Sequence, residues 1–207
     1  MKIKHALVKA EEQFCVNKFC EGVYVTEQQT ISESKNENSS RYNIIIELIN
    51  KMKIKEDFSL IDLGCGMADI LPQIKREFPH SELYGVDVYN ENVKYDFDSF
   101  IFYKADFIEL LNFKFNCDIA FMLNLYHSPG TFHVNNDLEK FMENLEKKIS
   151  LRFKYFITLL NSEQYDSFKN EIGHYSDIRA KIIYEIGELH PNNIQNKYVA
   201  IEFLKKK

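Results

Sequence analysis

An acidic residue and two closely spaced glycines mark residues 62–66 as a candidate ligand-binding turn. An apolar run leads into Asp62, and Gly64 and Gly66 follow with Cys65 between them. A second apolar run ends at Asp87, 21 positions after Gly66. The order of strand, glycine-rich turn, helix, strand and acid is typical of the first half of a nucleotide-binding α/β sheet.

The charges around this turn disfavour a phosphate ligand. The dinucleotide fingerprint requires a third glycine where this chain has Asp69. Asp62 and Asp69 would repel a pyrophosphate, and no Gly-Lys-Ser/Thr follows the glycines, which excludes a P-loop. The pattern favours a cationic ligand without phosphate, whose ribose hydroxyls donate to a carboxylate such as Asp87.

Strands alternate with helices from residue 41 onward, which predicts an α/β fold with a doubly wound, mostly parallel sheet and helices on both faces. Two final strands joined by a short polar connection predict a C-terminal antiparallel hairpin. The expected helices are Arg41–Lys53, Asp69–Phe78, Asp137–Ile149 and Ser162–Ile172, and the expected strands are Ser59–Leu63, Glu82–Asp87, Phe100–Lys104, Cys117–Leu123, Tyr155–Leu160, Ala180–Ile186 and Lys197–Leu204.

The predicted sheet gathers the polar residues of interest at one edge. Asp62, Gly64, Asp87, Asp106 and Asn124 each lie at or just after the end of a predicted strand. Ligands of such sheets bind beyond the carboxyl ends of the strands, where the strand order reverses. We therefore expect these residues to surround one ligand.

Residues 58–127 resemble the Rossmann-like (class I) S-adenosylmethionine-dependent methyltransferases, and the order of elements resembles that family from about residue 41 onward. The resemblance implies S-adenosyl-L-methionine as cofactor, a sulfonium and ammonium compound without phosphate. The turn Asp62-Leu63-Gly64-Cys65-Gly66 matches the segment under the methionine part of the cofactor. Ala68 departs from the pattern, because many members have a third glycine at this position.

The same resemblance implies roles for residues at the next strand ends. Asp87, with Val88 after it, matches the acid that holds the ribose hydroxyls, and Asp106 matches the residue that bonds the adenine amino group. Phe107 would lie against the adenine ring, although a core position fits it equally well. Asn124 falls near the methionyl end of the cofactor and the substrate.

The residues after the fourth strand supply the candidate catalytic base. His127 lies where a methyl acceptor should approach, and a histidine titrates near neutral pH, which suits proton removal from a hydroxyl. Tyr126 and His133 are candidate substrate contacts, and His133 is a weaker candidate base. A role for His127 in a loop hydrogen bond remains the alternative.

The first 40 residues are interpreted as an N-terminal cap, and residues 41–207 as the cofactor-binding domain. Residues 27–40 are almost wholly polar, which favours a lid that orders over the cleft or a plain surface linker. Tyr24 and Arg41 flank this segment and are further candidate substrate contacts.

These features predict a methyltransferase acting on a small molecule or a glycan-type acceptor, with methylation at oxygen preferred. The alternatives are an N-methyltransferase, an RNA methyltransferase that works with a partner, and a cofactor-binding scaffold without catalysis. No Asp/Asn-Pro-Pro-Tyr/Phe motif is present, which disfavours methylation of adenine in DNA. The acceptor itself is left open, since the fold does not define it.

Composition and charge limit the partners, cellular location and metals to be expected for this protein. The chain has 207 residues, 45% of them hydrophobic, and a net charge of −5 without a basic stripe, so nucleic acid is disfavoured as a partner. There is no apolar run of ~20 residues and no signal peptide, which predicts a cytoplasmic protein without a membrane span. The four cysteines form no C-x-x-C pair, and the six histidines show no metal-site spacing, so no metal is expected. The sequence is compatible with a homodimer.

Overall fold

The computed structural model describes residues 1–16, 42–66, 68, 70–87, 99–123, 148–172, 180–189 and 195–204. The helices are α1 (Ile3–Val16), α3 (Leu71–Glu77), α4 (Phe107–Leu111) and α6 (Ser162–Ile172), and a further helix covers residues 42–51. The strands are β1 (Ser59–Leu63), β2 (Glu82–Asp87), β3 (Ile101–Lys104), β4 (Cys117–Met122), β5 (Phe153–Asn161), β6 (Ala180–Leu189) and β7 (Gln195–Phe203). All seven predicted strands are therefore present.

The strands form one sheet in the order β3-β2-β1-β4-β5-β7-β6. The first five strands in this order are parallel, and β7 is antiparallel to both β5 and β6. The chain leaves β1 toward β2 on one side and later returns to β4 on the other side of β1. The strand order thus reverses between β1 and β4, which is where ligands of such sheets bind.

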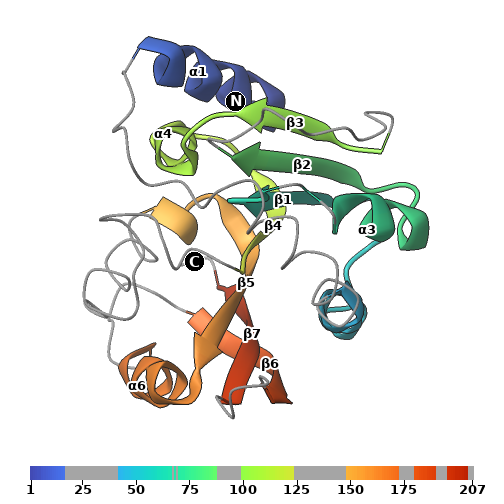
Figure 1. The fold of residues 1–207 in the computed structure, drawn as a ribbon, viewed down its shortest axis with the longest axis vertical. Coiled ribbons are helices and arrows are strands. Elements are labelled where there is room, and N and C mark those ends of the chain that lie inside the picture. The colour runs from blue at the N-terminus through green and yellow to red at the C-terminus, as the bar shows by residue number, and fades with distance from the viewer. Residues whose placement is uncertain are drawn as a thin grey trace, which may run out of the picture.

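Two hydrophobic cores cover the two faces of this sheet. Figure 1 shows α4 and α6 on one side of the sheet and α3 on the other. The first contains side chains from α1, α4 and α6, and the second contains side chains from α3 and the 42–51 helix. Alternation along β7 shows the division, because Tyr198 and Ala200 join the second core while Val199 and Ile201 join the first. The sheet is therefore doubly wound, as the sequence predicts.

Helix α1, which lies in the segment predicted as an N-terminal cap, packs on the sheet. Ile3, Ala6, Leu7 and Ala10 are buried in the first core, and α1 packs against α4 and β3. Their spacing of three and four residues places all of them on one side of a helix. Helix α1 thus shares a hydrophobic core with the sheet, whereas the predicted lid at 27–40 lies outside the described residues.

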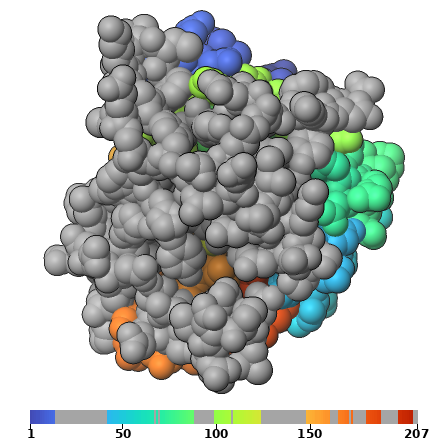
Figure 2. All heavy atoms as spheres, viewed as in Figure 1, coloured from blue at the N-terminus to red at the C-terminus, as the bar shows by residue number. Residues whose placement is uncertain are grey.

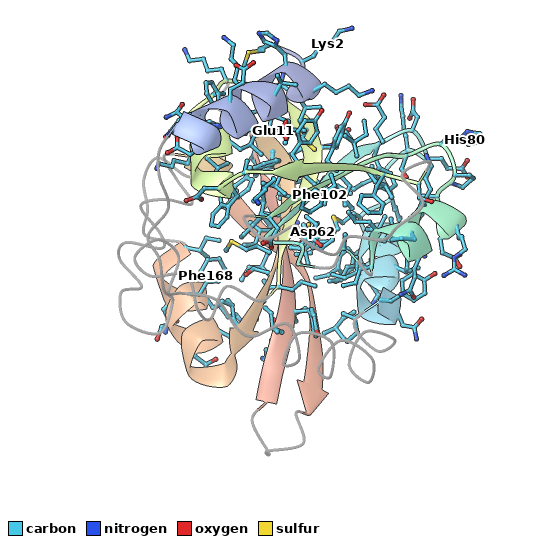
Figure 3. The ribbon with its side chains drawn as sticks, turned by 45° about the horizontal axis from the view of Figure 1, so that its top comes forward. Lys2, Glu11, Asp62, His80, Phe102 and Phe168 are labelled. Carbon is cyan, nitrogen blue, oxygen red and sulfur yellow. The ribbon has the colours of Figure 1, made fainter. Side chains whose placement is uncertain are left out.

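The surface helices are partly visible in Figure 2, where α1, α3 and the 42–51 helix lie on the outside of the molecule. Lys4 and Lys9 of α1 are exposed, as is Lys2 just before this helix, and Figure 3 shows Lys2 projecting outward beside α1. Within the described ranges, no helix is long and apolar enough to cross a membrane.

Candidate functional site

The turn between β1 and α3 adopts the backbone that its glycines permit. Gly64 has φ of 81° and Gly66 has φ of 52°, and both values lie in the left-handed region that favours glycine. The amides of Gly64 and Cys65 both donate to the Val86 carbonyl, at 2.8 and 3.1 Å. The turn is thus attached to the end of the neighbouring strand β2.

Asp87 joins this turn through its side chain. The Gly66 amide donates to Oδ2 of Asp87 at 2.8 Å. The backbone carbonyl of Asp87 accepts the Ala105 amide at 3.0 Å, just beyond β3. One residue at the end of β2 therefore connects the glycine turn to the end of the next strand.

Asp62 is a second carboxyl group at this edge and is almost fully buried, with 6% of its surface exposed. It lies in β1 between Gly85 of β2 and Phe121 of β4 (Figure 3). Burial raises the pKa of Asp62 well above its usual range, and the nearby Asp87 raises it further. Two close carboxyl groups place negative charge at this edge, which suits a cation and disfavours a phosphate.

The Cys65 side chain lies within the turn as a neutral thiol. Burial raises the pKa of Cys65 well above its usual range, and Asp62 and Asp87 add to this effect. Because a thiol reacts as the thiolate, this environment makes Cys65 a poor nucleophile. Its role in the turn is one of packing.

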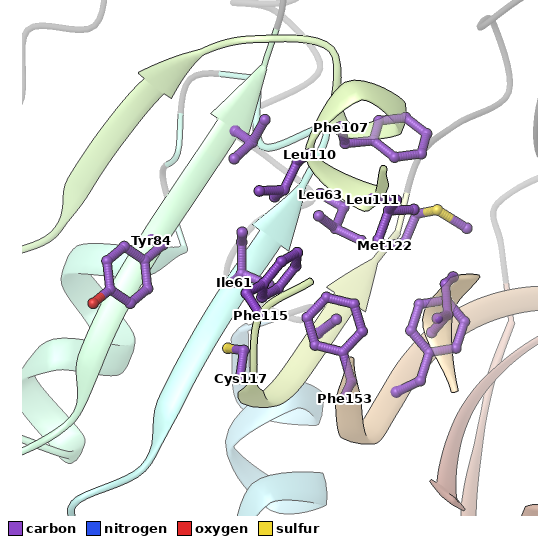
Figure 4. Packing of buried hydrophobic residues seen from close by; sticks show 14 of the residues in the cluster. Ile61, Leu63, Tyr84, Phe107, Leu110, Leu111, Phe115, Cys117, Met122 and Phe153 are labelled. Carbon is purple, nitrogen blue, oxygen red and sulfur yellow. The ribbon is translucent and has the colours of Figure 1, made fainter. Parts of the chain in front are cut away.

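Asp106 and Phe107 follow β3 and begin α4. The Asp106 carbonyl accepts the Leu110 amide at 3.2 Å, in the first turn of this helix. Phe107 is 6% exposed and packs in the first core with Leu110 and Leu111 (Figure 4). The core position predicted for Phe107 is therefore observed, and its contact with the adenine ring stays a prediction.

The structure brings together Asp62, Gly64, Cys65, Gly66 and Asp87, and it places Asp106 beyond the end of β3, the strand that pairs with β2. The remaining predicted site residues lie outside the described part of the chain; they are Tyr24, Arg41, Val88, Asn124, Tyr126, His127 and His133. Among the residues that are described, no group of three His, Cys, Asp or Glu side chains could hold a metal ion.

Tyr42, the neighbour of Arg41, lies away from the glycine turn. Its hydroxyl donates to Oε1 of Glu77 at 3.0 Å, and Glu77 is the last residue of α3. Burial and this bond raise the pKa of Tyr42. Since the glycine turn precedes α3, Tyr42 lies at the opposite end of that helix.

Comparison with solved structures identifies the fold. The methyltransferase domain of bacterial CtHen1 has a TM-score of 0.55 at 14% identity and covers 81% of this chain and 100% of its own. The METTL16 MTase domain has a TM-score of 0.57 at 13% identity, and the match covers 80% of this chain and 68% of the METTL16 chain. M. capricolum TrmK was solved with the cofactor product S-adenosyl-homocysteine. It has a TM-score of 0.52 at 14% identity, and the match covers 78% of this chain and 67% of the TrmK chain.

No protein-family model matches the chain, and no curated protein matches it in sequence. The solved structures confirm the predicted fold class: the chain has the Rossmann-like fold of the class I methyltransferases, with a mostly parallel seven-stranded sheet and a C-terminal antiparallel pair.

Proposed function

We propose that the protein is an S-adenosylmethionine-dependent methyltransferase whose cofactor binds at the β1–α3 turn. The observation that carries this proposal is the bond from the Gly66 amide to Oδ2 of Asp87, beside the buried carboxyl group of Asp62. It combines a left-handed glycine turn with two acids at the point where the strand order reverses. The structural similarity to TrmK in complex with S-adenosyl-homocysteine supports the same ligand class.

The donor set at this edge fits the cofactor chemically. An ionised carboxylate accepts several hydrogen bonds at once, so Asp87 can bind ribose hydroxyls while it holds the Gly66 amide. The Asp87 carboxylate attracts a sulfonium and an ammonium group, and a cation bound beside Asp62 would lower the raised pKa of Asp62 and favour its ionised form. When bound, the cofactor would supply an activated methyl group, and the protein's main contribution would be to place the acceptor.

We further propose that the acceptor is a small molecule methylated at oxygen, with His127 as the base. His127 would take the hydroxyl proton of the acceptor, and Asn124 would lie between cofactor and acceptor. Tyr24, Tyr126 and His133 are the proposed acceptor contacts. Arg41 is a further proposed acceptor contact.

Calorimetry with four ligands tests cofactor binding. We expect S-adenosylmethionine and S-adenosyl-homocysteine to bind, and NAD and ATP not to bind. Asp87→Ala should weaken binding by at least about tenfold, because it removes the ribose acceptor and the anchor of Gly66. Asp57→Ala, at an exposed acid just before β1, should bind as the wild type does. Uptake of NAD or ATP with no response to either adenosyl compound would overturn the proposal.

Acceptor chemistry is tested with His127→Asn and, as control, His80→Asn at an exposed histidine after α3. For an oxygen acceptor, His127→Asn should lower kcat by about 100-fold or more and remove the neutral-pH limb of the rate profile. Binding of S-adenosyl-homocysteine should stay unchanged. A rate that remains nearly intact would indicate a nitrogen acceptor instead, and salt-sensitive binding to tRNA or rRNA would contradict the small-molecule assignment.

A further inference from the structure

Gly85 lies beneath the proposed cofactor turn and leaves space that no other residue type would leave. It is buried in the middle of β2, in register with Asp62 of β1. A Cβ atom at this position would lie 2.9 Å from Sγ of Cys65 and 3.1 Å from Cδ1 of Leu71. The first distance is shorter than a carbon and a sulfur atom can approach without displacement, so the thiol occupies the space of the missing side chain.

The contact matters because Cys65 is held from two sides. Its amide, like that of Gly64, donates to the Val86 carbonyl of the same strand, and its thiol packs on Gly85. Cys65 has one side-chain torsion, so a displaced sulfur atom has few alternative positions. Movement of the sulfur would therefore shift the turn itself and the Gly66 amide that donates to Asp87.

Leu71 is the first residue of α3, and its contact with Gly85 brings this helix close to β2. In dinucleotide-binding folds, a third motif glycine allows this close packing of helix and strand. That position is Asp69 in this chain. A glycine in the adjacent strand provides the required space here, which explains a residue that otherwise weakens a strand interior.

We propose that Gly85 is a positioning residue of the cofactor site: by lacking a side chain it seats the Cys65 thiol and thereby sets the Gly64–Gly66 turn against Asp87. The identity of the ligand in this inference rests on the proposed function. The positioning of the turn rests on the packing of Gly85 and Cys65 alone. The effect of Gly85 on binding must therefore pass through Cys65.

A double-mutant cycle tests this dependence. Gly85→Ala should weaken S-adenosyl-homocysteine binding about tenfold by calorimetry, and it should shift the amide NMR signals of Gly64 and Gly66. The same change in a Cys65→Ala background should weaken binding less than about twofold, because only the 3.6 Å contact to Cβ of residue 65 and the flexible end of Leu71 then remain.

Gly187→Ala is the matched control. Gly187 is also a strand glycine, but a Cβ there would meet no atom within 4 Å. This variant should bind as the wild type does, with unchanged Gly66 signals. If Gly85→Ala does not fold, Cys65→Val offers a second route, because it overfills the same contact from the side of the turn and should also weaken binding and move the Gly66 signal.

The possible results separate the two proposals. Wild-type affinity and unmoved Gly66 signals in Gly85→Ala would overturn the positioning role, and so would equal losses in both backgrounds of the cycle. A lower Tm with unchanged affinity would show a purely structural glycine and would also overturn it. If the wild type binds neither adenosyl compound, the proposed function fails, while the Gly66 signals still decide whether Gly85 positions the turn.

Discussion

Asp62 has opposite consequences for folding and for ligand binding. Burial and the neighbouring Asp87 raise the pKa of Asp62 well above its usual value of 3.8. Between the ordinary and the raised pKa, the unfolded chain is ionised at this residue while the folded chain holds a proton. The free energy of unfolding therefore falls as pH rises through this interval, and the lost stability is not regained at higher pH. A bound cation would offset this penalty.

Asp62→Asn is expected to stabilise the ligand-free protein at pH 7 by an amount on the order of 1 kcal/mol, because an amide replaces a buried carboxyl group next to Asp87. The gain should be absent near pH 4 and should grow as pH rises. Urea unfolding across this range measures it. The same variant should bind S-adenosylmethionine about tenfold more weakly, since a cation loses a charge partner.

The control for this change is Asp57→Asn, at an exposed position just before β1. It should change neither stability nor affinity. If Asp62→Asn instead lowers stability at pH 7, the buried carboxyl group makes stabilising interactions when ionised. That outcome would contradict the inference that the ionised Asp62 destabilises the folded protein and that a bound cation offsets this cost.

At the scale of elements, α1 is the clearest test of how the domain is built. Leu7 is fully buried in the first core, while the next residue, Val8, is 41% exposed. Leu7→Ala should lower the free energy of unfolding by about 2–5 kcal/mol, whereas Val8→Ala should change it by less than about 0.5 kcal/mol. Chemical denaturation measures both variants. A small effect of Leu7→Ala would mean that α1 is a separate cap after all.

The sheet could be predicted from sequence because its strands are apolar runs with clear ends. β1 and β2 begin and end where the sequence predicts, since a charged or glycine residue follows each run. β5 and β6 extend beyond their predicted ends by a few residues, into positions where polar side chains alternate. Hydrophobic pattern thus determined the order of strands better than their limits.

Helices α1 and α4 and the role of Gly85 were not predicted from the sequence, each for a physical reason. Helix α4 has five residues, which is too short for a helical repeat to show. Helix α1 did carry a signal in the spacing of Ile3, Ala6, Leu7 and Ala10, but its lysines made the segment look polar. Gly85 had no signal of its own, because its importance depends on Cys65 and Leu71, which only the folded chain brings beside it.

At the scale of the whole molecule, the sheet separates the two cores. The proposed site lies at the edge of the sheet, where elements that pack in each of the two cores meet. Asp62 and Cys65 belong to the side covered by α3, while α4, which begins after Asp106, packs in the other core with α1. A ligand across the ends of β1, β2 and β3 would therefore contact elements supported by both cores. Binding at this edge should stabilise the domain as a unit.

Amide hydrogen exchange tests this unity. The slowest amides of α1 and of β4 should exchange with the same free energy, because both elements pack in the first core and unfold together. S-Adenosyl-homocysteine at 100 times its Kd should raise both values by about 2.7 kcal/mol, as expected for a ligand of the folded state alone. Amides of the exposed residues 55–57 should exchange quickly with or without ligand. If the α1 amides exchange at a lower free energy that the ligand does not change, α1 opens independently of the sheet, and its packing against α4 does not couple it to the proposed site.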